Sequence, residues 1–349
     1  MIFINKKILV IFILLNLTII ASFSSASKIN INLSNDFSFE ESKLEHIEKI
    51  YYVDDNREQS WYNETNYKEI GAAIYNATGG STIYVYSGIY NETIEIIRPL
   101  DIYGEDKNTT IIDGQSKGDV VSIFSDGTEF SGFTVKGSGD KILFYNTGIK
   151  VEADDVKIFD NIIKENVVGI LVGKYFNVQI FNNEIINNKK KLFISAGIKL
   201  STSENCIIKD NVIKNNGFSG GIHIYQSYEN IIKNNTIEKN KGHGIYILLS
   251  SNNDILYNNI KRNIYGIYIY DSFNNNITKN NLILNLKQAT FMVIQTKKYD
   301  NYWNSNYWNR PRLLPYFIKG SKIVDIPIIH KNLKIPLFDF DMYPAKNPN

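Results

Sequence analysis

Several residue types are scarce in this sequence of 349 residues, and each scarcity excludes a class of protein. Cys206 is the only cysteine, so the chain can form no intramolecular disulfide and must draw its stability from packing. The net charge is only +2 and no long basic run is present, which makes nucleic acid a poor candidate partner. The repeated region described below also lacks any helix-length stretch with a period of 3.6 residues. This absence argues against leucine-rich, ankyrin and TPR-like arrays.

A short phrase that begins with glycine recurs through the middle of the chain. Each copy reads Gly-Ile-x-Ile or a close variant, and a polar turn, a second short apolar stretch, Asn-Asn and a third short apolar stretch follow. Successive copies begin 21, 28, 24, 23 and 22 residues apart, at Gly148, Gly169, Gly197, Gly221, Gly244 and Gly266. A period of this length indicates a solenoid, in which each repeat buries its apolar face only against its neighbours.

The alternation of apolar and polar residues within each copy predicts strands rather than helices. Three short strands and three turns in roughly 23 residues make one coil of a parallel β-helix, and the chain has room for about nine such coils. Asparagine suits the turns because it tolerates the left-handed backbone region. Stacked asparagine side chains can also hydrogen-bond from coil to coil. We therefore expect an all-β parallel β-helix.

Residues 1–27 are typical of a cleaved secretory signal. Lys6 and Lys7 form its basic start, residues 8–20 its apolar core, and small residues around Ala26 its cleavage zone. The alternative is an uncleaved anchor, although the apolar core is short for a membrane span. We expect a secreted or cell-surface protein, which would contact a membrane only through an uncleaved signal segment.

The flanks of the repeat predict a leader and two caps. Residues 28–49 are polar with weak periodicity, which is typical of a flexible leader. A first strand and a short amphipathic helix at residues 67–77 make residues 50–80 an N-terminal cap, and regular coils are expected over residues 81–286. Residues 287–349 contain two of the three tryptophans and most of the seven prolines, which cannot continue a ladder. They predict a C-terminal cap, with an aromatic glycan-binding patch as the alternative.

The Gly-Ile-x-Ile and Asn-Asn-x-Ile coils resemble the repeats of NosD-like right-handed parallel β-helix proteins, also called the carbohydrate-binding and sugar-hydrolysis type. Residues 82–90 and 102–114 are similar to the N-terminal coils of that group, and residues 301–344 resemble the ending of its exported archaeal surface members. The resemblance covers residues 50–345 and implies a right-handed helix. It implies less about activity, because this architecture is shared by lyases, hydrolases, binders and structural rods.

The NosD resemblance implies a copper-handling role, which requires clustered His, Met or Cys residues. The sequence has three methionines, one cysteine and four widely separated histidines, which are His46, His223, His243 and His330. His223 and His243 belong to adjacent coils but to different places around the coil. Cys206 stands where the next coil has Asn230, so we expect it to replace a structural asparagine. We therefore predict no cofactor and no metal site.

The sequence gives only weak support for catalytic residues. The triplet around His243, Gly-His-Gly, is similar to a motif of polygalacturonase-type β-helix enzymes, but the accompanying Asp pair and Arg-x-Lys are missing. Asp160 and Asp210 align two coils apart, about 9.6 Å, near the outer limit for an inverting glycosidase pair. The alternative is that Asp and Asn interchange freely in this turn, because asparagines hold the places taken to be equivalent: Asn182, Asn234 and Asn280.

One feature favours binding. Both isoleucines of Gly-Ile-x-Ile point inward, so the x residue points outward, and stacking places successive x residues about 4.8 Å apart. The glycan-binding candidates in this line are Lys199, His223, Tyr246 and Tyr268. Exposed rings beside hydrogen-bonding groups suit sugars, although an ordinary solvated β-face would show the same pattern.

The sequence therefore favours an exported, non-catalytic protein with an adhesive, glycan-binding or structural envelope role. Its expected partner is a polysaccharide or cell-envelope glycan. The alternatives are a polysaccharide hydrolase or lyase with an unrecognised site and a NosD-like copper-handling accessory protein.

Overall fold

The computed structural model describes residues 49–140, 146–189, 194–294, 299–326 and 331–349. The predicted signal (1–27) and all but the last residue of the predicted leader (28–49) lie outside these residues. No helix in the described ranges is long and apolar enough to cross a membrane.

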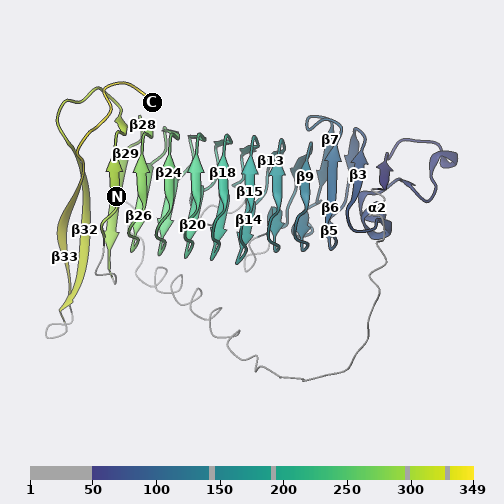
Figure 1. Cartoon of the computed structure of the whole chain (residues 1–349), viewed down its shortest axis with the longest axis horizontal. Helices are drawn as coiled ribbons and strands as arrows, with labels where there is room; N and C mark the ends of the chain where they lie inside the picture. The colour runs from purple at the N-terminus through teal and green to yellow at the C-terminus, as the bar shows by residue number, and fades with distance from the viewer. Residues whose placement is uncertain (1–48, 141–145, 190–193, 295–298, 327–330) are drawn as a thin grey trace, which may run out of the picture. The chain divides into compact units, whose positions relative to one another are not determined.

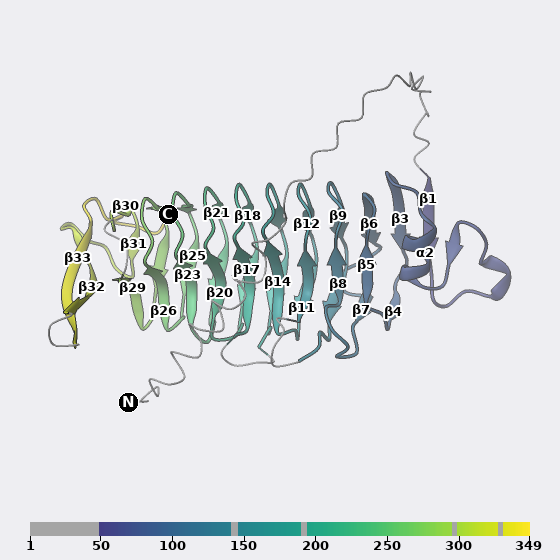
Figure 2. The same ribbon diagram turned by 90° about the horizontal axis from the view of Figure 1, so that it is seen from below.

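Strands dominate the structure, and they stack coil upon coil along one axis (Figures 1 and 2). Each coil contributes one strand to each of three parallel faces, and nine such coils run from β5 to β31. The first face contains β5 (Ile94–Ile96), β8 (Val121–Ile123), β11 (Thr147–Val151), β14 (Val168–Gly173), β17 (Ala196–Ser201), β20 (Gly220–Tyr225), β23 (His243–Leu248), β26 (Tyr265–Tyr270) and β29 (Lys287–Val293).

The second and third faces follow in chain order. The second contains β3 (Ser81–Val85), β6 (Leu100–Gly104), β9 (Glu129–Ser131), β12 (Lys157–Phe159), β15 (Gln179–Phe181), β18 (Ile207–Lys209), β21 (Ile231–Lys233), β24 (Asp254–Leu256), β27 (Asn276–Thr278) and β30 (Tyr302–Asn304). The third contains β4 (Gly88–Tyr90), β7 (Thr110–Asp113), β10 (Thr134–Lys136), β13 (Ile162–Lys164), β16 (Glu184–Ile186), β19 (Val212–Lys214), β22 (Thr236–Glu238), β25 (Asn259–Lys261), β28 (Asn281–Ile283) and β31 (Tyr307–Trp308). The predicted all-β parallel β-helix of about nine coils is confirmed.

The core is a set of aliphatic columns inside the coils. Ile222 and its paired neighbour Ile245 are fully buried, and the same position is aliphatic in the coils on either side. Burial of one such side chain stabilises the fold by roughly 1.5–3 kcal/mol. The repeat glycine is needed because coils approach closely there. A Cβ on Gly221 would lie 2.6 Å from a methyl group of Ile237 and 2.9 Å from the carbonyl oxygen of Gly244.

Asparagine has two separate roles in the turns. In pairs such as Asn182-Asn183 and Asn234-Asn235 the first residue takes the left-handed conformation, with φ of 57° at Asn182 and at Asn234. The second residue turns inward and bonds to the next coil: Asn235 Nδ2 donates to Asn258 Oδ1 at 3.0 Å. This ladder consists of Asn161, Asn183, Asn211, Asn235, Asn258, Asn280 and Asn306. The expected coil-to-coil bonding is therefore present.

Two sequence predictions depend on these positions. Cys206 does replace a ladder asparagine, since its backbone N–H donates to Asn230 Oδ1 at 2.9 Å. The equivalence drawn between Asn280 and the residues aligned with Asp160 is wrong, because Asn280 belongs to the inward ladder. The left-handed place in that coil belongs to Lys279 (φ 56°), so the position accepts side chains other than Asp and Asn.

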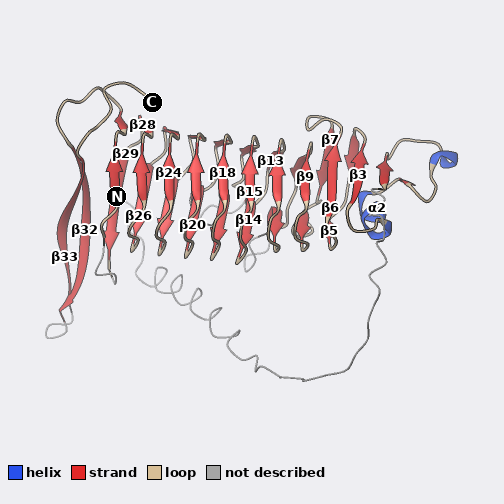
Figure 3. Ribbon diagram, in the orientation of Figure 1, coloured by secondary structure: helices blue, strands red, loops and turns tan. Residues whose placement is uncertain are grey.

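The N-terminal end carries the only α-helix in the described ranges (Figure 3). It follows β1 (Ile50–Val53), the 3-10 turn η1 (Gln59–Trp61) and β2 (Asn66–Tyr67), and it is α2 (Ile70–Asn76). The prediction of a helix from residue 67 started it too early. The Glu92 carboxylate accepts hydrogen bonds from the N–H groups of Ile70 and Gly71, which fixes the first turn at Ile70.

The stack runs past residue 286, where the sequence predicts the coils to end. Strands β29, β30 and β31 form one more coil, paired in parallel with β26, β27 and β28. Trp303 and Trp308 are 3% and 1% exposed and occupy inward places that aliphatic residues hold elsewhere. Because tryptophan replaces the usual aliphatic residues here, the sequence pattern did not predict this regular coil. A long antiparallel hairpin, β32 (Tyr316–Ile326) and β33 (Lys331–Asp341), then covers this coil.

Candidate ligand-binding surface

The four predicted binding residues lie in one line on the first face. Lys199 pairs with His223, His223 with Tyr246, and Tyr246 with Tyr268, on the adjacent strands β17, β20, β23 and β26. Alternation along each strand directs these side chains away from the core, as predicted.

These side chains are less open than the sequence led us to expect. The rings of His223 and Tyr246 stack with centroids 4.8 Å apart, and those of Tyr246 and Tyr268 stack 5.3 Å apart with only 8° between their planes. Stacking covers the ring faces, so the expected series of exposed platforms is not present. Lys199 is buried, with 8% exposure.

A second line of side chains lies beside the first and was missed by the sequence reasoning. His243 pairs with Tyr265, and Tyr265 pairs with Lys287. These residues form a line that runs beside the line of repeat glycines. The His243 ring stacks on Tyr246 at 4.7 Å and on Tyr265 at 5.2 Å. The signal was available, because His243 and Tyr265 each directly precede a repeat glycine. We call the two lines, made of His223, His243, Tyr246, Tyr265 and Tyr268, the aromatic ladders.

Burial keeps the aromatic ladders uncharged. Burial lowers the pKa of His243 to about 4 and holds the pKa of His223 well below 6.5. It raises the pKa of Tyr268 to about 12. Lys199, next in line, has its pKa lowered by burial to about 8. The rings of His223, His243 and Tyr268 are therefore neutral at pH 7.

Both ladders end at an open cavity of about 220 Å³. Tyr268 stacks on Tyr246 on one side, and its next partner in the line is Thr290, which has no ring. Tyr265 stacks on His243, and its next partner is Lys287. The rings of Tyr265 and Tyr268 also stack on each other, with centroids 5.5 Å apart, and both line the cavity. Its lining comes from β26, β29 and the hairpin: Tyr265, Tyr268, Lys287, Thr290, Phe291, Met292, Lys319, Gly320, Ser321 and Lys334.

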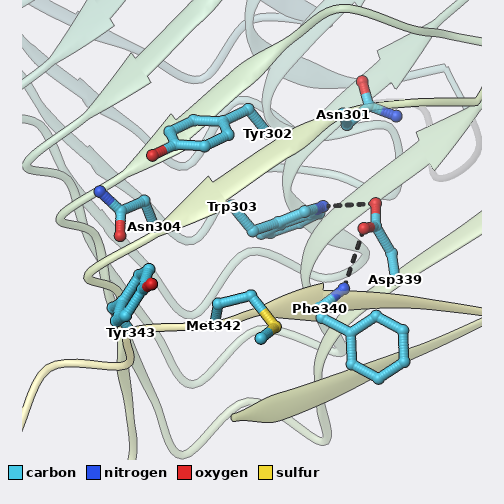
Figure 4. Close-up of a pocket in the computed structure, with 8 residues that line it drawn as sticks. All are labelled: Asn301, Tyr302, Trp303, Asn304, Asp339, Phe340, Met342 and Tyr343. Carbon is cyan, nitrogen blue, oxygen red and sulfur yellow. Dashed lines mark hydrogen bonds between the residues drawn. The ribbon is translucent and has the colours of Figure 1, made fainter.

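A second cavity, of about 340 Å³, lies between β30 and β33 (Figure 4). Asp339 accepts hydrogen bonds from Trp303 Nε1 at 3.0 Å and from the N–H of Phe340 at 2.9 Å. Burial is the main cause that raises the pKa of the Asp339 carboxyl to about 6. Tyr302 and Tyr343 line the same cavity and are 60% and 74% exposed.

Comparison with known proteins identifies the architecture. The family model described as "Right handed beta helix region" matches residues 193–306. The chain is a right-handed parallel β-helix. No curated protein sequence matches it.

Solved structures of low sequence identity share this β-helix. Pectate lyase Pel9A is 15% identical with a TM-score of 0.52, over 74% of this chain and 80% of the lyase chain. The DFA-IIIase from Arthrobacter chlorophenolicus A6, solved in complex with DFA-III, is 14% identical with a TM-score of 0.51, over 78% of this chain and 84% of that one. At these identities the likeness concerns the fold.

Among the described residues, the other sequence candidates do not line the cavity at the end of the aromatic ladders. The Asp160 carboxylate forms an ion pair with Lys107 at 2.8 Å on the outer surface. His223 and His243 come closer than the sequence suggested, because both stack on Tyr246. In the part of the chain that the structure describes, no three His, Cys, Asp or Glu side chains gather as metal ligands.

Proposed function

We propose that this β-helix binds a polysaccharide at the end of the aromatic ladders without cleaving it. The carrying observation is that Tyr265 and Tyr268, the last rings of the two ladders, line one cavity. Sugar rings pack their C–H faces on aromatic rings, while nearby polar groups bond to their hydroxyls. Thr290 and Ser321 supply hydroxyl groups in the same cavity. The lyase fold relative supports the idea that such a scaffold can serve a polysaccharide.

Retention and cleavage should be measured together on a polysaccharide panel. We expect the wild type to be retained by at least one polymer without releasing reducing ends, and Tyr268→Ala to lose that retention. Tyr75→Ala is the matched control, because Tyr75 is a 74% exposed tyrosine on α2, outside the first face. Equal retention of wild type and Tyr268→Ala would contradict the proposed site.

A catalytic role is the second candidate, and Asp339 is the observation in its favour. A carboxyl group with a pKa of about 6 can hold a proton near neutral pH, as a general acid must. Release of reducing ends that disappears in Asp339→Asn would establish this alternative. A wild type that releases none would reject it.

We also propose that the protein is exported and acts at the cell surface, as residues 1–27 suggest. Recovery of the full chain from the envelope or medium fraction would support this, and retention in the cytoplasm would contradict it. The NosD-like copper role has one point in its favour: His223 Nε2 and His243 Nδ1 are buried without a hydrogen-bond partner. Titration of metal-free protein with copper tests it, because such a role requires a tight site.

A further inference from the structure

The cavity at the end of the aromatic ladders also carries a concentrated positive charge. We propose that it binds an acidic polysaccharide, whose carboxylate or sulfate groups are held by Lys287, Lys319 and Lys334. This inference rests on the proposed glycan-binding function and specifies the class of glycan.

Three strands bring these lysines together. Lys287 is the first residue of β29, Lys319 belongs to β32 and Lys334 to β33, and all three line the cavity. All three are exposed, and none forms an ion pair within the described ranges. No acidic residue lines the cavity among the residues that the structure describes.

The charges are close enough to influence one another. Burial lowers the pKa of Lys287, and the positive charges of Lys334 and Lys319 lower it further. Some lysines elsewhere in the molecule have carboxylate partners, as Lys157 does with Glu129 at 2.7 Å. Three mutually repelling ammonium groups without a counter-charge form a favourable place for an anion.

The register of β26 and β29 places positive charge next to the two rings that would hold an acidic sugar. Lys287 is the strand partner of Tyr265, and Thr290 is the partner of Tyr268, so cations and hydroxyls lie one strand beyond the two rings. Neighbouring strands are about 4.8 Å apart, which is close to the width of one sugar ring. A uronic acid packed on Tyr265 or Tyr268 would therefore direct its carboxylate over β29, toward the lysines.

A polysaccharide fits this surface better than nucleic acid. Lys287, Lys319 and Lys334 form a single group of positive charge, while the rings of the aromatic ladders beside them are neutral. Nucleic acids require phosphate contacts repeated along the strand, and the net charge of the chain is only +2. The aromatic line beside the lysines suits a polymer of sugar rings.

The test compares polymers that differ in charge but not in backbone. The full-length protein would be titrated with sodium polygalacturonate and with its fully methyl-esterified form, and in parallel with dextran sulfate and dextran. We expect at least about tenfold tighter binding to a charged polymer than to its neutral partner, weakened by added salt. The two pairs distinguish carboxylate from sulfate as the preferred anion.

Variants assign the effect to the site. The triple variant Lys287→Gln, Lys319→Gln, Lys334→Gln should lose the preference for charge. The control, Lys117→Gln, Lys164→Gln, Lys233→Gln, removes the same charge from other faces and should keep it. Circular dichroism would verify that both variants fold.

The outcomes distinguish the acidic-glycan inference from the proposed glycan-binding function. Equal binding of charged and neutral polymers would overturn the acidic-glycan inference and leave glycan binding intact. Binding to no glycan would overturn the proposed function itself. Duplex DNA bound as tightly as polygalacturonate through the same lysines would overturn the assignment to a polysaccharide.

Discussion

The inward asparagine of the turn, such as Asn235, bonds neighbouring coils of this β-helix to one another. Asn235 is fully buried and donates to Asn258 Oδ1, to the Ile208 carbonyl and to the Lys233 carbonyl at 2.9–3.0 Å. Its own Oδ1 accepts from Asn211. Asn235 thus satisfies backbone groups in its own coil and in the preceding one, which buried polar groups require.

Asn235→Ala should destabilise the fold by roughly 2–5 kcal/mol, because several buried groups lose their partners at once. Urea unfolding followed by circular dichroism measures the change. Asn234→Gly is the matched control, since residue 234 only needs to adopt a positive φ, which glycine does freely. A similar loss of stability in both variants would contradict the role given to the inward side chain.

Asp339 gives a pH-dependent signal. Its pKa rises from 3.8 to about 6 in the folded state, so folding favours the protonated form. Its contribution to stability is therefore fully present below about pH 4 and is lost as the pH rises through about 6. Since Trp303 donates to this carboxyl, tryptophan fluorescence should titrate with a midpoint near pH 6 in the wild type. The same titration in Asp339→Asn should lack that step; its persistence there would contradict the assignment.

At the residue scale, the sequence predicted which residue types fill the repeat positions better than it predicted what surrounds each side chain. The replacement of a ladder asparagine by Cys206 followed from alignment of the coils alone. The half-burial of His223 and Tyr246 did not, because it arises from rings on neighbouring coils that face one another. Asp339 could not be identified, since its raised pKa depends on burial beside Trp303.

At the scale of elements, the aromatic ladders assign different roles to similar tyrosines. Tyr246 is stacked on both sides, by His223 and Tyr268, whereas Tyr268 lines the cavity at the end of its ladder. Tyr246→Ala should mainly lower stability, by about 1–3 kcal/mol, because it interrupts the stack. Tyr268→Ala should mainly weaken glycan binding. Thermal unfolding and polymer retention, measured on both variants, test this division, and an identical pattern in the two would contradict it.

The Asp341 carboxylate is one of the contacts that hold the β32–β33 hairpin to the last coil. Asp341 Oδ2 accepts from the N–H and Nδ2 of Asn306 and from Trp308 Nε1, at 2.9–3.1 Å, and so ends the asparagine ladder. Asp341→Ala should release the hairpin before the coils unfold. Limited proteolysis is then expected to cut after residue 308 while the fragment before it survives. Uniform resistance equal to that of the wild type would contradict this anchoring role.

The coils could be predicted because the same short sequence signals recur in each of them. Glycine stands where neighbouring coils approach closely, isoleucine points inward, and asparagine stands in the turn. The last coil was missed since Trp303 and Trp308 break the residue pattern while keeping the inward positions. The β32–β33 pairing and the cavity beside it depend on contacts between segments distant in sequence. Their lysines, on three strands, show no spacing that would reveal them.

At the scale of the whole molecule, stacking turns small repeats into continuous lines of side chains. Each line extends only as far as the residue type repeats, and both aromatic ladders stop at β26. It is therefore the last rings of the ladders, and not the rings within them, that line a cavity. This explains why the proposed site lies beside the C-terminal hairpin, which also supplies two of its three lysines.

The most direct test of this account is hydroxyl-radical footprinting of the full chain with and without sodium polygalacturonate. The account predicts protection of Tyr265, Tyr268 and Met292, with no change at Tyr302, Met342 and Tyr343 of the second cavity. Protection of the second group alone would place the glycan at the Asp339 cavity and contradict the central claim.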